Sequence, residues 1–504
     1  MTTGDSAIDT PRTKWVWLLL AFVALVVFFA GLTMPLVGPD EPRYAQVARE
    51  MFERGDWVTP TLGGFNWFEK PALLYWLQIA SFNIFGVSEF AARFGSALFG
   101  IGTVAALWTL GRHVEQPLTN NEPPTTNSFA NWLGLMAAST LGIIVFAHGA
   151  SFDIILTFPM TAALVSFFIF HLNGRVKWLV AFYFFIGLAI LAKGLVGIVF
   201  PFAIVGLFYV LARRLPDKKF MFGLVWGTVL ASAVAATWYV PMYIRHGWEF
   251  IDQFFVQHHF QRYTSNKYLH PQPFHFFFWV LPLMTIPWLP FFFNGLWNFG
   301  RGIFSQRNSA ADDDRGRSDM LLFAIAWLAV PLAFFTFSGS KLPGYILPAV
   351  PAAIILSADS VFRYVKNSKR RQILLQGIAA STFALVLISI YVFAPAFAEN
   401  DSVKGLFAVA RERSLEDLPV MTMHRVSHNA EFYSTGLLLR EPDGKQKRLL
   451  GPWEVVAEMR RMGTRRTLVL VPAEYLYHLT QSDFITTEIL RGNEEWTLAL
   501  VSEK

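Results

Sequence analysis

The sequence predicts an α-helical membrane protein that crosses the bilayer many times and ends in a small water-soluble domain. Hydrophobic residues make up 54% of its 504 residues, whereas charged residues make up only 15%. One soluble core cannot absorb that much apolar side chain, so lipid must be part of the solvent. The 17 Trp and 14 Tyr favour the same interpretation, because these side chains gather where a bilayer meets water.

Apolar runs of spanning length occupy most of the chain before Pro395. A spanning helix needs roughly 20 mostly apolar residues, and about eleven such runs are present. The first run is too long for the apolar core of a typical signal peptide and lacks a clear cleavage site, so we interpret it as a retained helix. The runs cover residues 15–36, 90–110, 129–148, 152–172, 178–192, 195–212, 220–243, 274–296, 320–337, 344–361 and 373–394.

Basic residues give the expected orientation of these helices. They concentrate in alternate short loops, which the positive-inside rule assigns to the cytoplasm. Two long outer loops, residues 37–89 and 244–273, then face the opposite side. An odd number of spans places the tail there as well, and its apolar stretches at 467–471 and 496–501 suggest a small α/β domain. We therefore divide the chain into a membrane domain, 1–395, and a C-terminal domain, 396–504.

Charge and cysteine content exclude several classes of function. The net charge of +6 lies mostly in loops between apolar runs, so it indicates membrane orientation and not nucleic-acid binding. The chain contains no cysteine, which rules out disulfides, thiolate metal sites and a cysteine nucleophile.

The unusual polar residues all fall at the outer rim of this topology. Charged groups at membrane depth are costly, so they usually face a cavity or one another, and their convergence predicts a functional site. Candidate catalytic residues are Asp40, Glu41 and Asp153; candidate substrate-binding residues are Arg43, Lys70, Lys193, Arg262, Lys341 and Tyr345; Glu69 and His259 are candidate metal ligands.

Asp40 and Glu41 follow the first span at the start of an expected interfacial helix. A carboxylate just outside lipid can act as a general base on an acceptor hydroxyl or amine. The alternative is a structural role, because Asp40 precedes Pro42 and is suited to cap a helix N-terminus.

Glu69 and Lys70 stand side by side at the mouth of an aromatic stretch. Neighbours in sequence point apart on a helix, so we expect them to serve two partners instead of pairing. Lys70 suits a phosphate, and Glu69 suits a metal or a sugar hydroxyl. The alternative is ordinary interfacial charge.

For the remaining candidates, a purely structural role competes with the functional one. Adjacent histidines at 258 and 259 lack the usual ligand spacing, whereas the planar guanidinium of Arg262 can clamp a phosphate. Lys193 and Lys341 could simply extend to the interface. Asp153, at the outer start of an apolar run, requires a cationic or hydrogen-bonding partner.

An ordered set of motifs resembles a known family. The segments Asp40-Glu41-x-Arg43-Tyr44, Phe68-Glu69-Lys70-Pro71, Lys193-Gly194, His259-x-Gln261-Arg262 and Lys341-Leu342-Pro343-x-Tyr345 carry the resemblance, together with Gly55-Asp56-Trp57. They resemble the lipid-to-acceptor aminoarabinose transferases of Gram-negative bacteria, within the protein O-mannosyltransferase-like superfamily of the GT-C fold.

The resemblance implies a polyprenyl-phosphate-linked sugar donor that enters an outward-facing cavity from the lipid. It implies that Asp40 is a base or essential carboxylate, and that Lys70, Arg262 and Tyr345 contact phosphate. Glu69 and His259 match residues near a divalent metal in that family, and no organic cofactor is implied. The implied location is the bacterial inner membrane, with the site and the C-terminal domain on the periplasmic side. About thirteen spans are expected of the aminoarabinose enzymes, more than the runs found here.

Two other interpretations stay open at this stage. One is a transferase of the same fold that uses another sugar and a protein or polysaccharide acceptor instead of lipid A. The other is a lipid or sugar transporter, although transporters commonly place coupling residues near the midplane and show matching halves. The candidate residues here gather at one rim, which favours a transferase.

Overall fold

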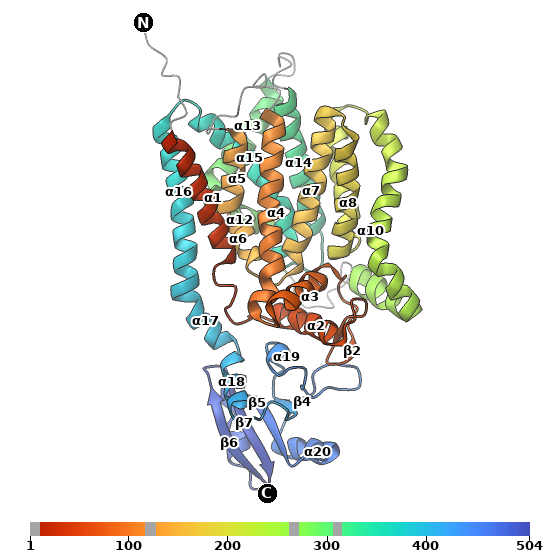
Figure 1. Ribbon diagram of the computed structural model, residues 1–504, viewed down its shortest axis with the longest axis vertical. Helices are drawn as coiled ribbons and strands as arrows, with labels where there is room; N and C mark the ends of the chain where they lie inside the picture. Colours follow the sequence, from red (N-terminus) through yellow and green to blue (C-terminus); the bar gives the residue numbers. More distant parts are fainter. Residues whose placement is uncertain (1–10, 116–127, 262–271, 306–314) are drawn as a thin grey trace. The chain divides into compact units, whose positions relative to one another are not determined.

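The computed structural model describes residues 11–115, 128–261, 272–305 and 315–504. The chain forms two compact units (Figure 1). The membrane unit comprises residues 1–30, 69–74 and 95–387, and the second unit comprises residues 31–68, 75–94 and 388–504.

The membrane unit is a bundle of apolar helices. Among the described residues, seven helices are long and apolar enough to cross a membrane, or nine if each of two bent pairs is one span. Its elements are α1 (Pro11–Phe29), most of α4 (Glu89–Glu115), α5 (Phe129–Ser139), α6 (Leu141–Ala147), α7 (Phe152–Asn173), α8 (Val176–Lys193), α9 (Val196–Ala212), α10 (Lys218–Ile251), η2 (Asp252–Gln261), α12 (Phe276–Met284), α13 (Leu289–Ser305), α14 (Arg315–Thr336), η4 (Pro343–Ala349), α15 (Val350–Val365) and α16 (Lys369–Ile388).

Two predicted spans are broken instead of continuous. α5 and α6 are bent by 55° at Thr140, and α12 and α13 are bent by 114° across the segment that contains Pro287. Proline has no N–H to donate within a helix, so it commonly kinks or ends one. The two breaks lie together, because the amide of Leu141 donates to the carbonyl of Ile286 at 2.9 Å. This bond satisfies a backbone group that lipid could not.

Glycines allow α8 and α10 to approach closely. A Cβ at Gly187 would lie 2.5 Å from the Cβ of Val234, and a Cβ at Gly227 would lie 2.1 Å from the ring of Tyr183. Small residues commonly line the contacts between membrane helices for this reason.

We predict that Gly227→Leu destabilises the bundle, because the new side chain occupies the space of the buried Tyr183 ring. Overpacking of this kind costs about 1–3 kcal/mol, which a lower unfolding temperature of the purified protein would reveal. The control is Gly206→Leu on α9, where a Cβ would meet nothing within 4 Å. Equal effects of the two substitutions would contradict the packing described here.

The second unit contains a five-stranded sheet with the order β4-β3-β5-β7-β6. β3 pairs in parallel with β4 and β5, whereas β7 is antiparallel to both β5 and β6. The elements are α2 (Asp40–Arg54), β1 (Thr61–Leu62), β2 (Phe65–Asn66), α3 (Leu73–Phe85), η5 (Ser389–Phe393), α17 (Ala394–Asp401), α18 (Lys404–Glu412), β3 (Val420–Met423), α19 (Ala430–Tyr433), β4 (Arg448–Leu449), α20 (Pro452–Met462), β5 (Arg466–Pro472), η6 (Ala473–Tyr475), α21 (Tyr477–Thr480), β6 (Ile485–Gly492) and β7 (Trp496–Glu503).

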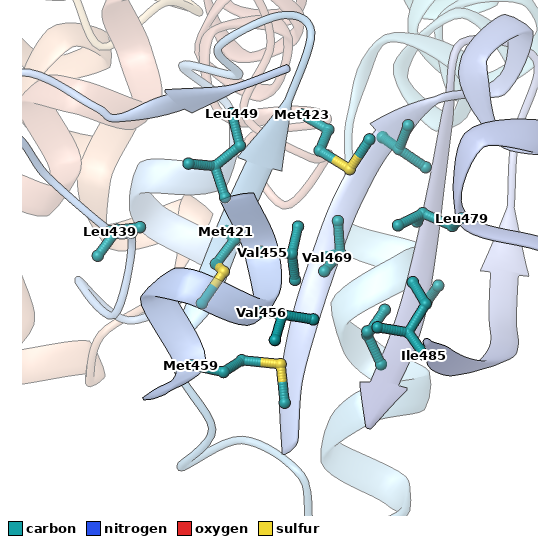
Figure 2. Packing of buried hydrophobic residues seen from close by; sticks show 13 residues of the cluster. Met421, Met423, Leu439, Leu449, Val455, Val456, Met459, Val469, Leu479 and Ile485 are labelled. Atoms are coloured by element: carbon teal, nitrogen blue, oxygen red, sulfur yellow. The ribbon is translucent and has the colours of Figure 1, made fainter. Parts of the chain in front are cut away.

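The sheet has its own apolar core, shown in Figure 2. Val455 and Met459 of α20 pack against Met421 of β3 and Val469 of β5, and all four side chains are fully buried. The alternating apolar residues of the tail therefore form one face of a sheet covered by a helix.

The C-terminal residues also hold the segment that follows α1. The hydroxyl of Tyr433 accepts a hydrogen bond from the amide of Leu36 at 2.8 Å, and the carboxylate of Asp401 accepts one from the amide of Gly38 at 2.9 Å. The predicted domain boundary near residue 395 lies close to residue 388, where the last segment of this unit begins. The unit also includes most of the first outer loop, which the sequence analysis assigned to the membrane domain.

Candidate functional site

Asp40 opens the first turn of α2 and is the most exposed of the candidate acids. Gly38 adopts a left-handed φ of 67°, and Pro39 occupies the N-cap position, so the capping role considered for Asp40 is not what the structure shows. The Asp40 side chain is 47% exposed, and its Oδ1 lies 2.5 Å from Nη2 of Arg43. Arg43 also donates from Nε to the carbonyl of Pro39 and lies 5.8 Å from the ring of Trp67. Asp40 is thus held by a cation while it remains open to solvent.

Glu41 points the other way, into a buried ion pair with Arg93 of α4. Nη2 of Arg93 lies 2.6 Å from Oε2 of Glu41, and Nε donates to Oε1 at 3.1 Å. The same guanidinium donates to the carbonyls of Met34 at 2.6 Å, Pro35 at 2.9 Å and Leu32 at 3.3 Å. Arg93 is only 4% exposed, so this one cation fixes both the carboxylate and the turn before it.

The second oxygen of Glu41 extends this frame toward Asp40. Oε2 accepts a hydrogen bond from the amide of Val37 at 3.1 Å. Three successive backbone amides before Asp40 are therefore hydrogen-bonded to side chains: the first to Tyr433, the second to Glu41 and the third to Asp401. The geometry gives Glu41 a positioning role for the turn that carries Asp40.

In the membrane unit, three candidate residues from separate segments meet. Asp153 lies in the first turn of α7, where Ser151 is the N-cap, and Lys193 is the last residue of α8. Nζ of Lys193 donates to Oδ1 of Asp153 at 2.5 Å and lies 4.9 Å from the centre of the Tyr345 ring. Lys193 supplies the cationic partner that an acid at position 153 requires.

Gly344 makes this meeting possible. A Cβ at residue 344 would lie 1.9 Å from Oδ2 of Asp153, so any larger residue would displace the carboxylate. Both charged side chains are 19% exposed, which leaves part of the pair accessible.

Lys341 is held inside the protein and does not extend to the interface. It is 7% exposed, and its Nζ donates to the carbonyl of Ser338 at 2.8 Å and to that of Gln272 at 3.3 Å. Its charge is thus partly balanced by backbone dipoles.

Glu69 and Lys70 correct one expectation from the sequence. They were expected to point apart as neighbours on a helix, but residues 67–72 form turns and no helix. Nζ of Lys70 and Oε2 of Glu69 come within 3.9 Å, and both side chains are largely buried. They form a loose ion pair, because the helical spacing on which the expectation relied does not apply here.

Two candidates cannot be placed. Arg262 lies outside the described residues, and His259 belongs to η2 but its side chain lies outside the description. Among the side chains that are described, no group of three or more His, Asp and Glu is arranged to hold a metal.

Arg93 is the important residue that the sequence analysis passed over. It lies within the run 90–110, which was read as a plain apolar span. A charge within a span usually has a buried partner and a function. That signal was sufficient to single Arg93 out.

Comparison with known proteins places the chain in a family. A sequence model described as dolichyl-phosphate-mannose-protein mannosyltransferase matches residues 12–263. The chain belongs to this family. The match covers all the candidate residues from Asp40 to Arg262, and the family confirms the resemblance found in the sequence.

Similar curated proteins carry a more specific name. The undecaprenyl phosphate-alpha-4-amino-4-deoxy-L-arabinose arabinosyl transferase of Aeromonas salmonicida (strain A449) is 30% identical over 380 residues, which cover 74% of this chain and 65% of that protein. The protein of the same name from Serratia proteamaculans (strain 568) is 30% identical over 352 residues, or 69% of this chain and 59% of that protein. The matched region thus spans about two thirds of the length of these relatives or less.

Solved structures share the fold. ArnT from Cupriavidus metallidurans, bound to undecaprenyl phosphate, is similar with a TM-score of 0.75 and 23% identity, over 97% of this chain and 98% of that one. The Archaeoglobus fulgidus oligosaccharyltransferase is similar with a TM-score of 0.51 and 12% identity, over 94% of this chain and 71% of that one. The prediction of an α-helical, multi-pass membrane protein is confirmed, whereas the number of spans stays a prediction.

We predict that Glu41→Gln destabilises the protein far more than Asp40→Asn does. Removing Glu41 leaves the buried Arg93 charge uncompensated, a loss of about 3–5 kcal/mol for buried pairs. Asp40 is about half exposed, and exposed pairs contribute about 0–1 kcal/mol. Thermal unfolding of the two purified variants measures the difference. Similar unfolding temperatures would show that Arg93 does not depend on Glu41.

Proposed function

We propose that this chain is a membrane glycosyltransferase that takes a sugar from an undecaprenyl phosphate carrier and transfers it to an acceptor at the outer face of the inner membrane. The observation that carries the proposal is the family match over residues 12–263. That half of the chain holds Asp40, Lys70, Asp153 and Lys193. Sequence patterns of basic loops support the orientation.

The chemistry of the reaction explains the need for cations. The bond between the sugar C1 and the carrier phosphate breaks, so positive charge develops on the sugar and negative charge on the departing phosphate. Fixed cations beside that phosphate stabilise the transition state more than the ground state. We assign Lys70 and Lys193 to this task, with Arg262 as a further candidate. Asp153 keeps Lys193 in position through their 2.5 Å contact.

Asp40 is assigned to the acceptor. When the acceptor is a hydroxyl, its oxygen forms the new bond to C1 while its proton passes to the Asp40 carboxylate. When the acceptor is a phosphate, it is already a nucleophile, and Asp40 orients groups instead. By analogy with glycoside hydrolysis, a single displacement from the opposite face inverts the configuration at C1. The exposure of Asp40 supports a role in contact with substrate, whereas Glu41 is occupied by Arg93.

For the sugar and acceptor we propose 4-amino-4-deoxy-L-arabinose and lipid A. The names of the relatives from Aeromonas and Serratia support the sugar and the carrier. A protein acceptor with another sugar is the second candidate, and the description of the matching family favours it. A transporter is disfavoured, because the candidate charged residues fall at the outer rim and the break at Thr140 and Leu141 carries no charge.

A divalent metal has limited support among the described side chains. Glu69 offers a carboxylate, but it already lies 3.9 Å from Lys70 and no described group of three ligands surrounds it. Glu69 and His259 stay predicted ligands, and no step of the reaction is derived through a metal.

We predict that cells lacking the gene lose one pentosamine from lipid A, and that wild-type protein restores it. Lys70→Ala should fail to restore it, because loss of one group that stabilises the developing charge lowers turnover about 10²–10³-fold. Mass spectrometry of extracted lipid A and envelope glycans measures both.

The control is Lys177→Ala, at an exposed lysine of the same unit that contacts only Trp178 among the described rings. This variant should restore the modification at equal expression. Loss of another glycan with unchanged lipid A would show that the acceptor is not lipid A. If neither lipid A nor any envelope glycan changed, the transferase proposal would be overturned.

A further inference from the structure

A groove in the membrane unit is lined by none of the candidate site residues. It is bounded by α1, α4 and α5, has a volume of about 600 Å³, and is lined mostly by apolar side chains. Cavities that bind small molecules run from about 300 to 1,000 Å³. Its size is therefore that of a ligand site and larger than a packing defect.

The groove is closed at one end by close helix packing. Gly100 of α4 allows Phe28 of α1 to approach, since a Cβ at residue 100 would lie 2.7 Å from the Phe28 ring. Val27 and Phe28 are fully buried, and the carbonyl of Val27 is bonded to Nε2 of His148 at 2.9 Å. α1 is thus anchored at its C-terminal end.

Toward its N-terminus, α1 leaves space between itself and its neighbours. Small residues line the groove on all three helices: Ala21 on α1, Ala105 on α4, and Gly134 and Ala138 on α5. Leu18 is 60% exposed although it lines the groove. Apolar surface of this kind in a membrane protein is suited to an acyl chain.

The open end of the groove carries two cations, Lys14 and Arg112. The Arg112 guanidinium lies 5.5 Å from the centre of the Trp108 ring, and Nε1 of Trp108 donates to Oδ1 of Asn131 at 3.1 Å. Gly134 lets this ring lie against α5, since a Cβ there would be 3.1 Å from Trp108. Arg112 is therefore held at the groove mouth by a chain of contacts that runs across two helices.

The acid nearest to Arg112 in sequence is engaged elsewhere. Glu115 accepts hydrogen bonds from the amides of Phe129 and Ala130 at the start of α5. Among the described residues, Arg112 has no carboxylate within ion-pair distance, and neither has Lys14. Glu115 interacts electrostatically with Arg112 but forms no ion pair with it, so the mouth presents two cations beside an apolar channel.

We propose that this groove binds one anionic phospholipid, with its phosphate between Lys14 and Arg112 and one acyl chain along the space between α1, α4 and α5. Basic pockets between membrane helices attract anionic head groups. The site is independent of the sugar donor, because none of its lining residues belongs to the candidate reaction site. A bound lipid would add contacts between α1 and the rest of the bundle.

Native mass spectrometry of the full-length protein tests the proposal. The detergent-purified chain is mixed with phosphatidylglycerol or with phosphatidylcholine of identical acyl chains. We expect one retained phosphatidylglycerol, and Arg112→Gln should lower its retention about five-fold without affecting phosphatidylcholine. The matched control is Arg301→Gln, which removes another arginine that lies over a tryptophan, Trp297, outside the groove.

Two further variants test the acyl-chain channel. Ala105→Trp and Ala21→Trp fill the groove from opposite walls, and each should reduce retention of both lipids. The control is Ala233→Trp, at an exposed alanine of α10 that does not line the groove. The proposal would be overturned if the protein retained the two lipids equally and Arg112→Gln did not change this. It would also be overturned if Ala105→Trp and Ala233→Trp had equal effects on lipid retention.

A photo-crosslinking amino acid in place of Ala105 identifies the occupant directly. A crosslink to phosphatidylglycerol supports the proposal. A crosslink to residues 1–10 of the same chain, or to a second copy of the chain, would overturn it.

Discussion

The buried ion pair between Arg93 and Glu41 is the contact on which the turn that carries Asp40 depends. One guanidinium binds a carboxylate and three backbone carbonyls, those of Leu32, Met34 and Pro35. Burial removes water as a competitor, so either group alone would be left with an uncompensated charge. This pair allows an exposed acid, Asp40, to be held at a defined place although it follows a turn with no regular structure.

The membrane unit also contains an ion pair between an acid and a base from separate segments, but this pair is less buried. Asp153 and Lys193 pair at 2.5 Å, but both remain partly accessible, and Tyr345 covers the lysine. A cation that is both paired and accessible can still stabilise a developing negative charge. In the reaction that we propose, cations act on the phosphate of the donor and a carboxylate acts on the acceptor, and this arrangement of charge supports the first of these roles.

Much of the fold could be predicted because hydropathy reports directly on burial in lipid. The apolar runs correspond to helices, and the outer-rim position of Asp153 indicated its need for a partner. Hydropathy does not report direction, so the bends at Thr140 and Pro287 were missed, although the proline itself was a signal. Glu69 and Lys70 were misjudged because a helical geometry was assumed for residues that form turns. Arg93 could be singled out as a charge within an apolar run, but its partners, Glu41 and three carbonyls, are set by tertiary structure.

Hydrogen exchange of residues 31–43, in wild-type protein and in Arg93→Gln, tests most directly whether this ion pair holds the turn that carries Asp40. The amides of Leu36, Val37 and Gly38 are bonded to Tyr433, Glu41 and Asp401. We predict that these amides exchange faster in the variant while β5 and β7 keep their protection. Unchanged protection of all three amides would contradict the central role given to Arg93.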